Sequence, residues 1–246
     1  MANVLVLGAT GDVGRGIAAA QLQHGHRVLA VARHAERLQA LAQELGSPPG
    51  LHTLTGTIAD DSHASQVLSA VRAIATQIDV VVVSVNGARQ LAPLLSNDSA
   101  EFAARIALDL VTHFTAARAF LPALAPNGVY LGIGGGSADF MLENGAHMSI
   151  AQAGLRMLYR GLAHEQRERN IHVRELIIAS VVNGASTRVH ADPLWVTDQE
   201  IGEHVANILA SPANFAGPIL RMARRDATGR PVLTTEPATR VQGLRS

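Results

Sequence analysis

Residues 4–14 read VLVLGATGDVG, a short apolar run followed by a turn with a glycine at every third position. A buried strand that ends in such a turn, with a helix opening behind it, is the arrangement that binds the diphosphate of a dinucleotide. The helix N-terminus offers unpaired N–H groups and a partial positive charge to the anion. A plain glycine-rich turn is the alternative. We therefore predict a dinucleotide-binding turn formed by Gly8, Thr10, Gly11, Asp12, Val13 and Gly14.

Strand-like and helix-like segments alternate along most of the chain. Apolar strand patterns cover Val4–Leu7, Val28–Ala32, Leu51–Thr55, Asp79–Val85, Val129–Ile133, His172–Ala179 and Pro218–Met222. Helix patterns cover Arg15–Gln23, Ala35–Leu45, His63–Thr76, Ala100–Leu121, Ile150–Glu168 and Ile201–Leu209. Continuous apolar strands that alternate with helices indicate a parallel sheet covered on both faces. The sequence predicts an α/β, Rossmann-type, doubly wound fold with seven parallel strands.

The domain boundary is placed by a change in composition. Residues 1–223 are expected to form a single dinucleotide-binding domain, and 185–200 an irregular loop that carries the only tryptophan. Residues 224–246 are polar and contain prolines, so we expect a C-terminal tail that is either disordered or laid on a neighbouring subunit.

Composition excludes several classes of function. Twenty basic residues balance twenty acidic ones in a chain of 246, which leaves no global attraction for nucleic acid. Cysteine and lysine are both absent, so thiolate and ammonium chemistry are excluded. The eleven histidines show no metal-ligand spacing, and we expect no metal site. No apolar run is long enough to cross a membrane and a strand pattern begins at Asn3, so we expect a cytoplasmic protein that binds no membrane.

The residues after the second strand bear on the choice of cofactor. Arg33 ends that strand and Arg37 follows one helical turn later, whereas an acid at the strand end would bind the ribose hydroxyls of NAD. A guanidinium suits the 2′-phosphate of NADP through paired, charge-assisted hydrogen bonds. We therefore predict NADP rather than NAD, with a solvated Arg33 as the alternative. Asp60 and Asp61 could contact the adenine, but capping of the next helix is the preferred interpretation.

At this point the chain resembles the short-chain dehydrogenase/reductase family. The resemblance rests on the glycine turn, on Ser84-Val85-Asn86-Gly87 after the fourth strand, and on the segments Phe102–Pro122, Met148–Glu165 and Ser211–Gly217, and it extends to about residue 222. It implies that Asn86 and Gly87 contact the cofactor and that the substrate is a small carbonyl or hydroxyl compound. It also implies a homodimer or homotetramer that pairs through helices 100–121 and 150–168.

The family's catalytic positions carry other residues in this chain. The resemblance places Met148 where the family has its tyrosine, Gln152 at the lysine, Gly135 at the serine and Asp109 at the asparagine. Methionine has no ionisable proton, and glutamine can bind a ribose hydroxyl but carries no charge that would lower a neighbouring pKa. Tyr130 and Tyr159 are expected to be packing residues.

Replacement proton donors can be sought near these positions. His147 could titrate near neutral pH, Ser137 and Ser149 offer hydroxyls, and Asp109 with His113 could form a pair on one helix face. For each of these residues a non-catalytic role is the preferred interpretation: a lone histidine before a helix is usually solvated, and Asp109 could simply bond Gln152.

Three functions stay open at this point. The first is an NADP-dependent oxidoreductase with an atypical site, its substrate entering under residues 192–197 with Trp195 as a lid. The second is a non-catalytic NADP(H)-binding protein for sensing or scaffolding. The third is a lyase or isomerase on the same fold.

Overall fold

The computed structural model describes residues 1–87 and 90–236. Its main sheet has eight strands in the order β10-β9-β6-β5-β4-β1-β2-β3. The strands are β1 (Asn3–Leu7), β2 (Arg27–Ala32), β3 (Leu51–Thr55), β4 (Ile78–Val83), β5 (Leu124–Gly135), β6 (His172–Ala179), β9 (Ile219–Arg225) and β10 (Pro231–Glu236). Two short strands, β7 (Val182–Asn183) and β8 (Val196–Thr197), pair outside this sheet. The doubly wound α/β fold is confirmed.

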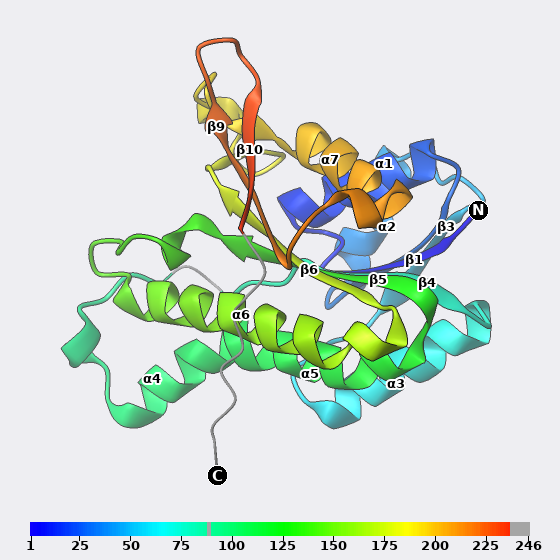
Figure 1. Cartoon of the computed structure of the whole chain (residues 1–246), viewed down its shortest axis with the longest axis horizontal. Helices are drawn as coiled ribbons and strands as arrows, with labels where there is room; N and C mark the ends of the chain where they lie inside the picture. Colours follow the sequence, from blue (N-terminus) through cyan, green and yellow to red (C-terminus); the bar gives the residue numbers. More distant parts are fainter. Residues whose placement is uncertain (88–89, 237–246) are drawn as a thin grey trace.

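Helices cover both faces of the sheet, as Figure 1 shows. One layer contains α1 (Asp12–Gln23), α2 (Ala35–Glu44) and α7 (Asp198–Ala210), and the other α3 (Asp61–Ile74), α4 (Ser99–Ile106), α5 (Thr112–Phe120) and α6 (Ala146–Glu165). Alternate residues of β1 point to opposite faces: Val4 and Val6 pack in the core under α1 and α7, and Leu5 and Leu7 in the core under α3, α5 and α6.

The predicted strand count of seven was one too low, and the sheet is not wholly parallel. β10 pairs antiparallel with β9, so residues 224–236 form the end of a hairpin and not the start of a tail. The turn between them is closed by Asp226, whose carboxylate accepts hydrogen bonds from the Thr228 backbone, while Gly229 supplies a positive φ of 78°. Polar residues misled the prediction because an edge strand tolerates them. The rest of the predicted tail, 237–246, lies outside the described residues.

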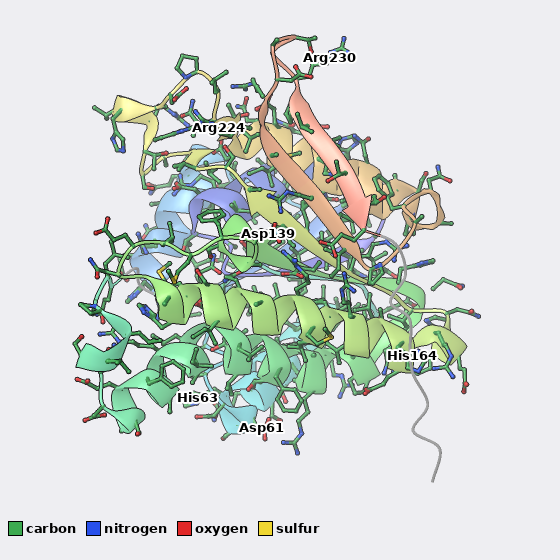
Figure 2. All side chains as sticks on the ribbon, turned by 60° about the vertical axis from the view of Figure 1, so that its left-hand side comes forward. Asp61, His63, Asp139, His164, Arg224 and Arg230 are labelled. Carbon is green, nitrogen blue, oxygen red and sulfur yellow. The ribbon has the colours of Figure 1, made fainter. Side chains whose placement is uncertain are left out.

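Ion pairs attach this hairpin to α6. Glu236 at the end of β10 pairs with Arg156 and Arg160 of α6. Asp139, which follows β5 and lies between α6 and the hairpin in Figure 2, pairs with Arg156 and with Arg221 of β9. These contacts fix β9 and β10 against the helix layer.

The helix predicted over Ala100–Leu121 is a continuous run with one irregularity. Residues 107–111 wind as a π turn between α4 and α5. The extra residue turns Asp109 inward, where its carboxylate accepts a hydrogen bond of 2.6 Å from the backbone N–H of Gly87. Such turns occur frequently at functional sites.

Within the described residues, no helix combines the length and the hydropathy needed to span a bilayer.

Candidate functional site

The glycine turn has the geometry expected of a dinucleotide cradle. Gly8 has a φ of 85°, and a Cβ there would lie 2.1 Å from the Ser84 carbonyl oxygen. A Cβ on Gly14 would lie 2.2 Å from the Gly8 carbonyl oxygen. The backbone N–H groups of Gly8 and Ala9 both donate to the Val31 carbonyl, which pins the turn to β2. Backbone can therefore approach a diphosphate here without side chains in the way.

Asp12 opens α1 directly behind this turn. Its carboxylate accepts a hydrogen bond of 3.0 Å from the Ser186 backbone N–H and another from the Ser186 hydroxyl. Ser186 belongs to the connection between β6 and α7, which reaches across to the glycine turn. The sequence places Asp12 in the turn, but no pattern in it shows this partner 174 residues away.

A cavity of about 340 Å³ lies at the carboxyl ends of β2 and β3, against α3. Its lining includes Arg33, Thr55, Thr57, His63 and Gln66. Arg37 lies on α2 and does not line it.

The helix beside this cavity is capped as expected. The Asp60 carboxylate accepts a hydrogen bond of 2.9 Å from the His63 backbone N–H, which confirms capping of α3. Asp61 follows and pairs with Arg118 of α5. Figure 2 shows Asp61 and His63 near each other at the start of α3.

Three of the positions at which the resemblance expects catalytic residues are engaged in backbone hydrogen bonds near the carboxyl ends of β4 and β5. Gln152 of α6 is buried, and its Oε1 accepts a hydrogen bond of 2.6 Å from the Gly135 backbone N–H. Asp109 is held by Gly87 in the same way. Burial raises the pKa of Asp109, and the Gly87 hydrogen bond and the charge of nearby His147 act in the opposite direction.

His147 lies in the first turn of α6, next to Met148. Its side chain is 4% exposed, and its Nδ1 has no hydrogen-bond partner among the described residues. A buried, unpartnered ring nitrogen is uncommon in a folded protein and usually requires an explanation. Ser149 is already engaged, because its hydroxyl donates to the Phe140 carbonyl at 2.9 Å. Ser137 lies in the short 3-10 turn Gly136–Ala138 that follows β5.

Asp109 and His113, which could have formed a pair, have other partners. His113 is fully buried, with Nε2 3.1 Å from the Val85 carbonyl and Nδ1 3.0 Å from the Tyr159 hydroxyl. A carbonyl can only accept, so Nε2 carries the proton and Nδ1 accepts from Tyr159. Burial lowers the pKa of His113 to about 4, so the ring is neutral at physiological pH.

Both tyrosines are core residues, as predicted. Tyr130 and Tyr159 are fully buried, and their rings stack with centroids 6.0 Å apart. A Cβ on Gly132 would lie 2.0 Å from Cζ of Tyr159, which shows how closely the ring fits against β5. Neither side chain has any surface open to solvent.

Glu175 is a polar residue that the sequence interpretation missed. It lies in β6, is fully buried, and neither carboxyl oxygen has a hydrogen-bond partner among the described residues. Burial raises its pKa to about 8, against an opposing effect of Arg156. The carboxyl fits against Gly134, where a Cβ would lie 2.1 Å from Oε1. The available signal was an acid inside the otherwise apolar strand HVRELIIA.

The described residues include no group of three histidine, cysteine or acidic side chains that could hold a metal ion. The site contains a glycine cradle, a cavity at the ends of β2 and β3 that is lined in part by Arg33, and the buried residues Asp109, His147 and Gln152. This arrangement suits a dinucleotide and one proton-handling pair.

Comparisons with known proteins agree with this geometry. A short chain dehydrogenase family model matches residues 2–192. The short-chain dehydrogenase/reductase iacG of Pestalotiopsis fici is 28% identical over 219 residues, which cover 87% of this chain and 83% of the relative.

Two solved structures share the fold. A metagenomic short-chain oxidoreductase in complex with NADP aligns with a TM-score of 0.70 at 25% identity, covering 85% of this chain and 90% of that one. A Pseudomonas aeruginosa short chain oxidoreductase described as containing an atypical catalytic center aligns with a TM-score of 0.76 at 20% identity, covering 86% of this chain and 91% of that one. The match of the family model to most of the chain shows that this protein belongs to the short-chain dehydrogenase/reductase family.

Proposed function

We propose that this protein is an NADP(H)-dependent oxidoreductase of small carbonyl or hydroxyl compounds, in which His147 and Asp109 take over proton transfer. The observation that carries the proposal is that Asp109 and His147 are both buried polar residues, and that the charge of His147 acts on the pKa of Asp109. An imidazole near a carboxylate can exchange a proton with a substrate oxygen at neutral pH.

The cofactor would be held by residues at the carboxyl ends of the strands. The backbone of Gly8, Thr10, Gly11 and Val13 would face the diphosphate, Arg33 the 2′-phosphate, Asn86 and Gly87 the adenosine side, and Gln152 a ribose hydroxyl. When bound, NADPH supplies a hydride. NADP in the complex of a 25% identical relative supports this choice over NAD.

Within this scheme the chain's own residues have separate roles. Asp109 is fixed by Gly87, and its carboxyl lies near enough to His147 for the two groups to interact through their charges. His147 gives its proton to the carbonyl oxygen during reduction and takes it back during oxidation. Ser137 would donate a hydrogen bond to the same oxygen.

The test is NADPH titration by fluorescence, followed by a panel of carbonyl and enone substrates. We expect binding and turnover, with His147→Ala lowering kcat about 10²–10⁴-fold while NADPH binding persists. His164→Ala is the matched control, because His164 is on the same helix and exposed at its other end. Equal activity of the His147 variant and the native protein would contradict the assignment of the acid.

A second function is favoured by Met148 and Gln152, which remove both the phenol and the ammonium group of the family. It is an NADP(H)-binding protein without turnover, acting in sensing or as a scaffold. Tight NADPH binding with no turnover across the panel would establish it. Absence of NADPH binding would instead point to a lyase or isomerase on this fold.

We further propose that the protein is a homodimer or homotetramer that pairs through α4, α5 and α6. The π turn between α4 and α5, together with α5 and α6, exposes large apolar side chains, namely Leu108, Val111, Phe114, Ile150 and Met157. Exposed apolar residues gathered on adjacent helices are typical of subunit interfaces.

A further inference from the structure

Residues 180–197, which we call the cover segment, connect β6 to α7 and carry Trp195. The segment is attached to the rest of the protein near both of its ends. Near one end Ser186 contacts Asp12 behind the glycine turn. Near the other, Pro193 and Trp195 contact Arg225 at the end of β9. The segment therefore extends from the proposed cofactor cradle to the β9–β10 hairpin.

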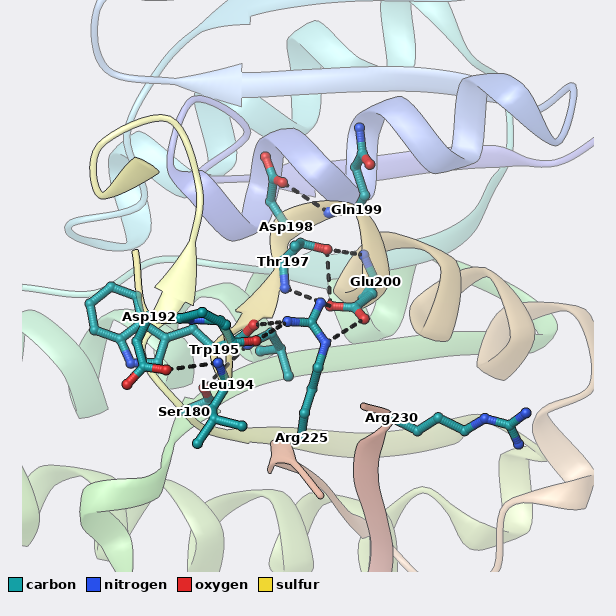
Figure 3. Close-up of polar contacts among 12 residues, drawn as sticks. Ser180, Asp192, Leu194, Trp195, Thr197, Asp198, Gln199, Glu200, Arg225 and Arg230 are labelled. Carbon is teal, nitrogen blue, oxygen red and sulfur yellow. Dashed lines mark hydrogen bonds and ion pairs between the residues drawn. The ribbon is translucent and has the colours of Figure 1, made fainter. Parts of the chain in front are cut away.

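Arg225 makes the stronger attachment, as Figure 3 shows. Its Nη1 donates to the Pro193 carbonyl at 2.7 Å and to the Trp195 carbonyl at 2.6 Å. Its Nη2 and Nε donate to the two oxygens of Glu200, at 2.6 Å and 3.2 Å. Bidentate pairs between arginine and a carboxylate are among the strongest hydrogen-bonded contacts in proteins.

Glu200 in turn closes the start of α7. It accepts a hydrogen bond of 2.8 Å from the Thr197 backbone N–H, and the Thr197 hydroxyl accepts one from the Glu200 backbone. Arg225 of β9 therefore bonds both to the cap of α7, through Glu200, and to the Pro193 and Trp195 carbonyls that precede this helix. The side chains of Arg225 and Glu200 are both mostly shielded from solvent, which limits screening by salt.

At Asp12 the backbone of the cover segment comes close to α1. Only two hydrogen bonds hold it there, so this attachment is easier to break. A Cβ on Gly184 would lie 2.5 Å from Cβ of Asp12, so a glycine is needed for the segment to come this near. The contact itself is the pair of hydrogen bonds from exposed Ser186.

An acid at this position conflicts with the proposed ligand. The first turn of α1 is where a dinucleotide diphosphate would lie, and a carboxylate there repels it. The N–H and hydroxyl of Ser186 both donate to that carboxylate, which offsets part of its charge and holds it on the cover segment.

We propose that Arg225 is a positioning residue of the cofactor site: it fixes the cover segment so that Ser186 engages Asp12 and keeps this carboxylate from opposing the diphosphate. The attachment by Arg225 stands without the proposed function, whereas the effect on the cofactor rests on it. The two parts are therefore tested separately.

The attachment is measured without cofactor through Trp195, which is the only tryptophan in the chain. In Arg225→Ala we expect red-shifted emission and stronger quenching by acrylamide, because the Trp195 carbonyl loses the Arg225 side chain as its partner. Arg225→Lys should be intermediate, since an ammonium cannot form the bidentate pair. Arg230→Ala is the matched control, because Arg230 lies beyond the hairpin turn and points away from the cluster in Figure 3. Identical Trp195 emission and quenching in native protein and Arg225→Ala would overturn the attachment.

The effect on the cofactor is measured by NADPH titration in a double-mutant cycle. Arg225→Ala and Ser186→Ala should each weaken NADPH binding about tenfold, which corresponds to losing a hydrogen bond to a charged group. In an Asp12→Asn background the same changes should cost about twofold or less, because the charge that Ser186 neutralises is gone. A merely structural role of Arg225 predicts equal losses in both backgrounds and would overturn the proposal.

Two further outcomes separate this inference from the proposed function. If the native protein does not bind NADPH, the proposed function and the effect on the cofactor are both overturned, while the Trp195 measurements still judge the attachment. If Arg225→Ala fails to fold, which circular dichroism would show, Ser186→Ala and Arg225→Lys carry the cycle, since Ser186 is exposed.

Discussion

At the scale of single residues, three polar side chains are buried in or behind the site, namely Asp109, Gln152 and Glu175. Two of them have backbone partners, Gly87 and Gly135, and the third has none among the described residues. Because burial without a partner disfavours the charged form, Glu175 is a protonated acid at neutral pH.

Glu175 predicts how stability depends on pH. Its pKa is raised from 4.5 to about 8 by burial, so the native state binds the proton more tightly than the unfolded state. The stabilisation is complete below about pH 4.5 and is lost as pH rises toward 8, with a slope of up to about 1.4 kcal/mol per pH unit. The charged groups that act on it are Arg156 and Arg160 of α6, Asp139, and Glu236 of β10.

Urea unfolding of Glu175→Gln across this pH range is the measurement. We expect the free energy of unfolding of the variant to vary less with pH than that of the native protein between pH 5 and 8. Glu168→Gln is the control, because Glu168 is largely exposed. Parallel pH curves for native protein and Glu175→Gln would contradict a protonated Glu175.

Arg33 predicts the choice of cofactor. It lines the cavity at the ends of β2 and β3, where a 2′-phosphate would meet a guanidinium. Arg33→Ala should weaken NADPH binding by about 10- to 100-fold and leave NADH binding nearly unchanged, because only NADPH carries that phosphate. Arg72→Ala on α3, which does not line the cavity, is the control for a general loss of positive charge. Equal loss of both cofactors would assign Arg33 another role.

At the scale of elements, α6 is fitted to β5 through Gly132, which leaves room for the Tyr159 ring. Tyr159 in turn donates to His113, which ties α6 to α5. The close approach of α6 to the sheet determines where Gln152 and His147 lie relative to the ends of the strands.

Gly132→Ala tests this fit. The added methyl would lie 2.0 Å from Cζ of Tyr159, and overpacking of this kind costs about 1–3 kcal/mol. Gly161→Ala on α6 is the matched control, because a Cβ there has nothing within 4 Å and alanine favours a helix by up to about 1 kcal/mol. We expect thermal unfolding to show a lower Tm for the first variant and an unchanged or higher Tm for the second. A native Tm for Gly132→Ala would show that Tyr159 can move aside.

At the scale of the whole molecule, each face of the sheet is covered by helices, and the outer surface of α5 and α6 stays apolar. Phe114 and Met157 are about half exposed or more on neighbouring helices. A charge at the centre of a subunit interface is strongly unfavourable when buried without a partner. The apolar surface therefore predicts an assembly that a single charge can break.

Light scattering on Phe114→Asp tests the assembly. We expect a dimer or tetramer for the native protein and a monomer for the variant. Leu95→Asp is the control, because Leu95 is 96% exposed and lies between β4 and α4, outside the helices that are proposed to pair. A native protein that is monomeric at micromolar concentration would refute the predicted pairing.

The order of strands and helices could be predicted from the sequence because apolar periodicity and glycine turns are local signals. Residues 4–14 alone indicated the glycine cradle. The absence of lysine excluded the proton relay through tyrosine and lysine that the family uses. The eighth strand was missed because an exposed edge strand such as Pro231–Glu236 has few apolar residues that must be buried.

The site could be predicted only in part. Sequence alone determined that a glycine cradle is present and that phenol–ammonium chemistry is absent, because both depend on which residues occupy adjacent positions. Only the tertiary structure decided that His113 pairs with Tyr159, that Glu175 is buried, and that Arg225 and Asp12 hold the cover segment. These contacts join residues far apart in the chain, and their partners are chosen by packing, which no local pattern records.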